Sequence, residues 1–185
     1  MVASRILGSN ISGASGRSGR GGCHHRCLCH ASPPGFCGRK RGIESNALGR
    51  SRGGVSTKVH ALVDTQGRPL HIELTPGQQH ESTVAESIIT QYARGKRVIA
   101  DTGYDSNAIR ACIRERGMTA VIHPSPSRKQ RPRLNRKAYR MRYMVEVFFH
   151  NLKRFRGLAT RFEKTARHYL SQLHVVCSLL WLPQQ

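Results

Sequence analysis

Acidic side chains are what this sequence has least of. Aspartate and glutamate together number 10, against 31 lysines and arginines, and the formal net charge is +21 at pH 7. The only aspartates are Asp64, Asp101 and Asp105. Such an imbalance points to a polyanionic partner. The alternative is a basic protein whose charge serves only its solubility.

A long apolar run is also missing. The best one, Leu173 to Leu182, contains His174 and Ser178 and is well below the ~20 residues that a bilayer requires. No apolar segment of a secretory signal follows Met1. These absences predict a cytoplasmic, nucleoid-associated protein with no membrane partner, whose six cysteines stay reduced.

The positive charge is concentrated in one stretch. Residues 128–167 hold fourteen lysines and arginines, and their only acids are Glu146 and Glu163. No apolar anchor accompanies these cations, so their density favours nucleic acid over a membrane surface. Within the stretch, residues 125–137 read as a basic loop, and we expect Arg128, Lys129, Arg131 and Arg133 to contact DNA phosphates.

The first 44 residues contain little that could build a core. They are rich in Gly, Ser and Arg and show no sustained period of two or 3.6 residues. The whole chain is 38% apolar, which is low for a globular protein. We therefore predict that residues 1–44 are disordered and that residues 45–185 form the folded domain.

Hydrophobic periodicity begins at Val55. Alternation and short apolar runs predict strands, and apolar residues three to four apart predict helices. The expected strands cover residues 56–63, 69–74, 97–101 and 118–122, and the expected helices cover residues 81–93, 106–116, 138–156 and 166–182. This order predicts a mixed α/β sheet covered by helices. Asp64 falls in the first hairpin turn, where an aspartate side chain bonds nearby backbone N–H groups.

Two carboxylates stand where chemistry is plausible. Asp101 follows the apolar run Val98-Ile99-Ala100, at the strand end where open α/β sheets place ligands. Glu146 lies where the apolar stripe of its helix meets a polar stripe, in the pattern Tyr139-x2-Arg142-x3-Glu146-x6-Lys153. The alternatives are a turn cap for Asp101 and a charged surface helix for Glu146.

The order of these motifs resembles a known family. The helix pattern and the segments before it are similar to the catalytic core of the bacterial insertion-sequence DDE transposases, in the branch that contains insertion sequences four and five. The resemblance covers about residues 45 to 182. It rests on the helix pattern and on Gly49-Arg50-Ser51-Arg52-Gly53-Gly54, Thr57-Lys58-Val59-His60-Ala61-Leu62-Val63-Asp64, Leu74-Thr75-Pro76-Gly77-Gln78-Gln79-His80 and Ile99-Ala100-Asp101-Thr102-Gly103-Tyr104-Asp105.

The resemblance implies a ribonuclease H-like fold and a divalent-metal site. Asp101 and Glu146 match the second and third catalytic carboxylates, which would bind Mg²⁺ or Mn²⁺, and Tyr139, Arg142 and Lys153 would lie near Glu146 or the DNA backbone. The family's first aspartate belongs to an upstream first strand. Here the only acid before Asp64 is Glu44. We therefore expect a core that lacks its first strand and a catalytic activity that is abolished or lowered by orders of magnitude.

Where the family's first strand and its aspartate would be expected, the sequence has a cluster of cysteine and histidine, Cys23-His24-His25-Arg26-Cys27-Leu28-Cys29-His30. Cys and His are zinc ligands, but C-x3-C-x-C-x7-C matches no common zinc module. The composition is typical of coding DNA read out of frame, so the chain reads as an N-terminally truncated or frameshifted relic.

Three functions are compatible with these patterns. The first is an insertion-sequence transposase that acts on terminal repeats and target DNA, with an oligomer possible. The second is a non-catalytic DNA-binding remnant of such an enzyme. The third is a zinc- and RNA-binding basic protein, which requires metal on residues 23–37.

Overall fold

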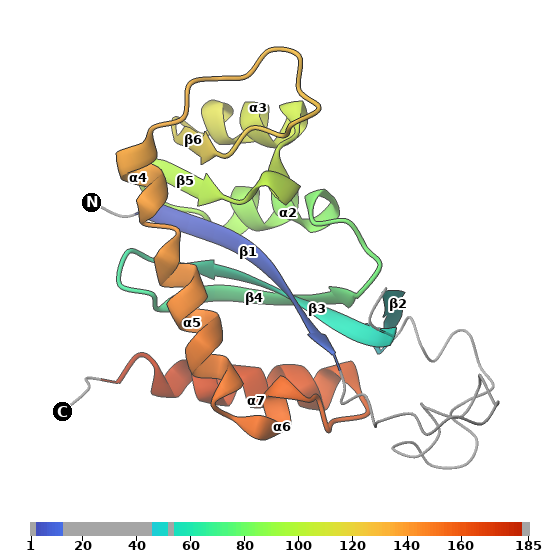
Figure 1. Cartoon of the computed structure of the whole chain (residues 1–185). Coiled ribbons are helices and arrows are strands. Elements are labelled where there is room, and N and C mark those ends of the chain that lie inside the picture. Colours follow the sequence, from blue (N-terminus) through green and yellow to red (C-terminus); the bar gives the residue numbers. More distant parts are fainter. Residues whose placement is uncertain (1–2, 13–45, 52–53, 183–185) are drawn as a thin grey trace.

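The central element is a six-stranded mixed sheet. The computed structural model describes residues 3–12, 46–51 and 54–182. The strands are β1 (Ala3–Ser12), β2 (Gly49–Ser51), β3 (Gly54–Val63), β4 (Pro69–Pro76), β5 (Arg97–Ala100) and β6 (Thr119–Ile122). Their order is β2-β3-β1-β5-β6, and β4 also pairs with β3 (Figure 1).

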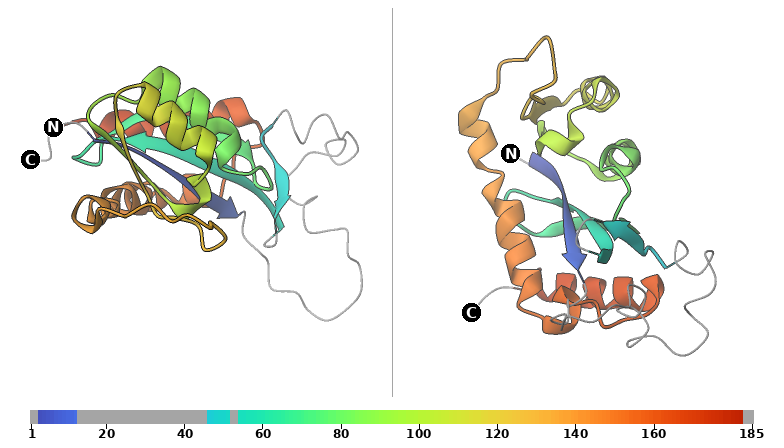
Figure 2. Two further views of the ribbon diagram at one scale, coloured as in Figure 1. Left: turned by 90° about the horizontal axis from the view of Figure 1, so that it is seen from above. Right: turned by 45° about the vertical axis from the view of Figure 1, so that its right-hand side comes forward.

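Helices cover both faces of this sheet. They are α2 (Ser82–Tyr92), α3 (Asn107–Glu115), α4 (Arg136–Arg140), α5 (Tyr143–Lys153), α6 (Arg156–Ala159) and α7 (Ala166–Leu179), with a short 3₁₀ turn η3 at Thr102–Tyr104. Figure 2 shows α2 and α3 on one side of the sheet and α4 and α5 on the other. The expected mixed α/β fold is therefore present.

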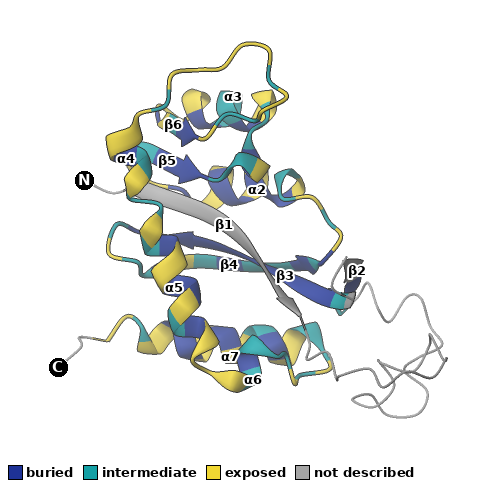
Figure 3. Cartoon of the chain, viewed as in Figure 1, coloured by how far each residue is buried: buried dark blue, intermediate teal, exposed yellow. Residues whose placement is uncertain are grey.

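Alternation along β3 produces the two main cores. Leu62 packs with α2, α3 and η3, while its neighbours Ala61 and Val63 pack with α5, α6 and α7. A third, smaller cluster joins Ile99 and Val121 to Ala138 of α4. Successive side chains of a strand point to opposite faces, so one strand supplies both layers. Strands β3 and β5 are coloured largely as buried in Figure 3.

Strand β1 corrects the expectation of a missing first strand. It lies between β3, to which it is antiparallel, and β5, to which it is parallel. Strand pairing uses main-chain groups, so a segment without the family's motif can still fill a central gap and satisfy both neighbours. The expected disorder is thus wrong for residues 3–12. Residues 13–45, with the cysteine and histidine cluster, lie outside the described residues.

The predicted 138–156 helix is divided. Between α4 and α5 the backbone hydrogen bonds span three residues instead of four. Met144 N donates to the Met141 carbonyl, and Val145 N donates to the Arg142 carbonyl. The division lets α4 pack on Ile99 and Val121 while α5 packs on β3 and α7.

The remaining predicted strands and helices are confirmed to within a few residues. Asp64 is confirmed as a turn residue, because its Oδ1 accepts from the backbone N–H groups of Gln66 and Arg68.

A buried histidine gives the fold an acid-sensitive point. His60 is fully buried, with Nδ1 3.0 Å from Tyr104 Oη and Nε2 2.9 Å from Thr75 Oγ1. Burial, and then the charge of Lys58, lowers the pKa of His60 to about 4. The native state therefore prefers the neutral ring, and the unfolded chain binds a proton first as the pH falls.

We expect the free energy of unfolding to decline between pH 6.5 and 4 because of His60. A lowered native pKa gives stability that is complete above about 6.5 and is lost as the pH falls through 4, by about 3 kcal/mol. Denaturant unfolding at pH 7, 5.5 and 4 checks this. The decline should shrink in His60→Gln and persist in the exposed control His150→Gln; an equal decline in both variants would contradict the assignment.

Candidate active site

Asp101 stands at the carboxyl end of β5 and opens a tight turn. Its Oδ1 accepts a 2.8 Å hydrogen bond from the Thr102 backbone N–H, which caps η3. The Tyr139 hydroxyl approaches the same oxygen at 3.5 Å. The capping role foreseen as an alternative is therefore present, and the half-buried carboxylate also faces Tyr139 of α4.

Glu146 is joined to this region through Arg142. The Arg142 guanidinium forms an ion pair with Glu146 and lies 5.8 Å from the centre of the Tyr139 ring. Burial and the negative charge of Asp101 raise the pKa of Tyr139, and Glu146 adds to this effect. Asp101, Tyr139, Arg142 and Glu146 thus form one connected polar group. The helix pattern predicts that Tyr139, Arg142 and Glu146 lie together, and the resemblance adds Asp101. Lys153 is exposed at the far end of α5.

The strand beside Asp101 provides no third carboxylate. Ile6 of β1 pairs with Ala100, so Leu7 is the next position along, in line with Asp101. The β1 sequence ASRILGSNIS contains no acid. Within the described part of the chain, no three His, Cys, Asp or Glu residues gather closely enough to hold a metal ion. Of the two carboxylates that match the family's metal ligands, Asp101 caps η3, and Glu146 is 53% exposed and paired with Arg142.

A partly buried ion pair lies beside the turn after Asp101. Lys58 Nζ lies 2.8 Å from Glu81 Oε1, and the lysine also donates to the Gln79 carbonyl at 2.7 Å. The Glu81 carboxylate lies against Gly103, where an added Cβ would come within 3.4 Å of it. Lys58 and Glu81 lie 23 residues apart, so their pairing could not be inferred from spacing.

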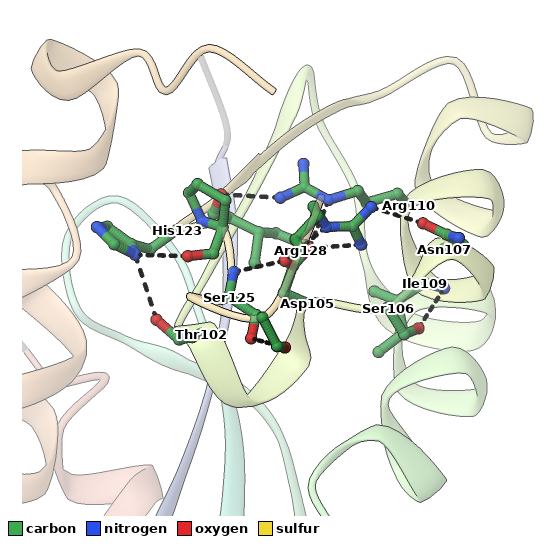
Figure 4. A network of polar contacts seen from close by, with 12 residues as sticks. Thr102, Asp105, Ser106, Asn107, Ile109, Arg110, His123, Ser125 and Arg128 are labelled. Atoms are coloured by element: carbon green, nitrogen blue, oxygen red, sulfur yellow. Dashed lines mark hydrogen bonds and ion pairs between the residues drawn. The ribbon is translucent and has the colours of Figure 1, made fainter. Parts of the chain in front are cut away.

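Asp105 anchors the basic loop between β6 and α4. Its side chain is fully buried and contacts Arg110 at 2.7 Å and Arg128 at 2.9 Å. The Ser125 backbone N–H donates to it at 2.7 Å (Figure 4). Burial raises the pKa of Asp105, but the hydrogen bonds from Arg128, Ser125 and Arg110 outweigh it and bring the pKa to about 2.

Arg128 has a structural role in this network. The sequence predicts that Arg128 contacts DNA phosphates; in the structure its guanidinium binds Asp105 and also donates to Asn107 Oδ1 at 2.7 Å. Arg128 therefore holds the loop against α3. The other predicted loop cations, Lys129, Arg131 and Arg133, are exposed. Most of the loop between β6 and α4 is coloured as exposed in Figure 3.

The loop separates two open pockets. One, of about 940 Å³, is lined by His123, Arg133 and Arg136. His123 lies 3.4 Å from Thr102 Oγ1 and has its ring 5.8 Å from that of Tyr139, so this pocket adjoins the carboxylates. The other, of about 900 Å³, is lined by α3, β6 and the loop. Arg131 and Pro132 border both.

Comparison with known proteins gives a consistent result. The family model described as a transposase DDE domain matches residues 37–181. A putative transposase for insertion sequence element IS6501 from Brucella ovis is 37% identical over 129 residues, which cover 69% of this chain and 99% of that protein.

Two further relatives are longer than this chain. A putative transposase for IS402 from Burkholderia cepacia is 32% identical over 146 residues, covering 73% of this chain and 66% of that protein. A transposase for IS1106 from Neisseria meningitidis serogroup B is 28% identical over 119 residues, covering 62% of this chain and 40% of that protein. The chain therefore spans nearly all of the first relative and only part of the other two.

Proposed function

Because this chain belongs to the family of transposase DDE domains, we propose that it is the DNA-binding core of a bacterial insertion-sequence transposase that has lost most or all of its strand-cutting activity. Its partners would be the terminal repeats of the element and target DNA, in the cytoplasm on the nucleoid. No helix in the described ranges has the length and apolar character needed to cross a bilayer. A homo-oligomer is part of the proposal, since two DNA ends must be brought together.

One observation carries the proposed loss of activity. Strand β1 occupies the central position beside β5 and has no acid to place next to Asp101. Members of this family are expected to use divalent ions, and carboxylate oxygens suit Mg²⁺. With Asp101 and Glu146 alone, the ligand that would bridge two ions is missing. The carboxylates then serve mainly the turn cap and the ion pair with Arg142.

DNA binding is supported by the pocket beside the carboxylates. Arg131, Arg133 and Arg136 border it, and its lining contains no acid. Arg142 and Lys153 extend the positive charge along α4 and α5. The zinc- and RNA-binding alternative depends on residues 23–37, which lie outside the described residues, and the relatives give it no support.

We expect strong, sequence-tolerant and salt-dependent binding to duplex DNA. Each neutralised phosphate contributes about 0.9 to the slope of log affinity against log salt, so roughly six contacts give a slope near −5. Fluorescence anisotropy with a 30-base-pair duplex across a salt series measures it. Arg133→Ala/Lys153→Ala should reduce the slope by about 2.

The matched control is Lys164→Ala/Arg167→Ala, which removes two exposed cations at the start of α7. This control should keep the slope of the native chain. A native slope near zero would show that the cations are only a solvated surface and would overturn the proposed function. Equal losses in both double variants would show that the charge acts without a defined face.

A further inference from the structure

The pocket between α3, β6 and the basic loop is positively charged and is not part of the site around Asp101. Five of its lining residues are cations, and none is an acid; the cations are Arg110, Arg114, Arg128, Lys129 and Arg131. The nearest carboxylate in the network is Asp105, whose side chain is fully buried and shared by Arg110 and Arg128. The pocket therefore keeps a large excess of positive charge.

The arginines of this pocket are held in place. Arg114 donates to the Arg110 carbonyl at 3.3 Å, and Arg131 donates to the Pro126 carbonyl at 2.6 Å. Arg110 donates to the Ile122 carbonyl at 3.0 Å as well as to Asp105. Carbonyl partners orient a guanidinium without cancelling its charge, so less rotamer freedom is lost when an anion binds.

The pocket is separate from the surface at the carboxylates. Its β6 residues, Thr119 and Ala120, pair with Arg97 and Val98 of β5, while Asp101 follows the opposite end of that strand. Thr119 is level with Arg97, four residues before Asp101, so at about 3.3 Å per residue it lies roughly 13 Å along the sheet from Asp101. The loop also stands between this pocket and the one beside His123.

We infer that this second pocket binds backbone phosphates of duplex DNA that flanks the strand at Asp101 and Glu146. The inference rests on the proposed function, because it adds a second contact to the same DNA-binding domain. Phosphodiesters fit the chemistry, since oriented guanidinium groups bind phosphate oxygens in pairs and Lys129 adds a mobile cation. The site recognises the charge of the backbone and not the base sequence.

The test removes two of the three pocket cations that do not hold Asp105. In the full chain, Arg114→Ala/Lys129→Ala should reduce the salt slope for a 30-base-pair duplex by about 1.8 and weaken binding at 0.1 M salt roughly tenfold or more. Lys164→Ala/Arg167→Ala is the control and should do neither. If the native chain binds steeply but both variants match it, the pocket assignment is wrong and the proposed function stands.

A second measurement needs no variant. Acetylation of the native chain, with and without the duplex, should show Lys129 protected by DNA and Lys164 modified equally in both samples. Unprotected Lys129 on saturated protein would overturn the inference even if the double variant failed to fold. A native chain that binds no duplex would instead remove the proposed function itself.

Discussion

Replacing Asp105 with alanine should lower the free energy of unfolding by about 3–5 kcal/mol, the cost of leaving partly buried charges without their partner. Asp105 is fully buried as a side chain and neutralises both Arg110 and Arg128, which are only 13% and 19% exposed. Without it, two guanidinium groups repel each other at the junction of α3 and the basic loop. Chemical denaturation at pH 7 measures the loss.

Glu115→Ala is the matched control for this prediction. Glu115 is an exposed carboxylate at the end of the same helix, and its removal should change the free energy of unfolding by about 0.5 kcal/mol or less. A loss below about 1 kcal/mol in Asp105→Ala would mean that the two arginines find other partners, and the anchoring role would be wrong.

Asp105 should also make the free energy of unfolding depend on pH in acid. The native pKa of Asp105 is about 2, against 3.8 for a free side chain. A lowered pKa gives stability that is complete above pH 3.8 and is lost as the pH falls through 2, by about 2 kcal/mol. Between pH 4 and 2 the native chain should lose this stability, and Asp105→Asn should lack that part of the loss.

Much of this arrangement was readable from spacing alone. The apolar run before Asp101 and the turn chemistry of Asp64 are local signals, and each acts over a few residues. The helix pattern around Glu146 correctly joined Tyr139 and Arg142 to the carboxylate, although the helix itself is divided in two.

The contacts that spacing could not supply are long-range. Asp105 meets Arg128 across 23 residues, and Lys58 meets Glu81 across the same separation. Neither pair shares a periodic pattern, so nothing in the sequence distinguished Arg128 from the exposed cations beside it. The pairing of β1 was missed for another reason: it depends on a gap in the sheet that only the folded domain creates.

Placing an acid on β1 should restore metal binding. Leu7→Asp would add a carboxylate at the position in line with Asp101. More oxygen ligands of negative charge raise divalent-ion affinity, so we expect Mn²⁺ to bind roughly tenfold or more tightly than to the native chain. Electron paramagnetic resonance of free Mn²⁺ gives the affinity.

Gly8→Asp is the matched control for the restored carboxylate. It adds the same charge one residue along β1, at a position that belongs to the opposite face of the strand. It should bind Mn²⁺ no better than the native chain. If both variants gain equally, the effect is only one of added charge, and the register argument fails.

Nicking of supercoiled plasmid in Mg²⁺ tests the central claim. This claim is that the domain binds DNA and has two of the family's three catalytic carboxylates, but lacks the one on the first strand. We expect no Asp101-dependent nicking by the native chain, and nicking by Leu7→Asp that disappears on adding either Asp101→Ala or Glu146→Ala. Nicking by the native chain that Asp101→Ala abolishes would contradict the claim, because it would show that the domain cuts DNA without an acid on β1.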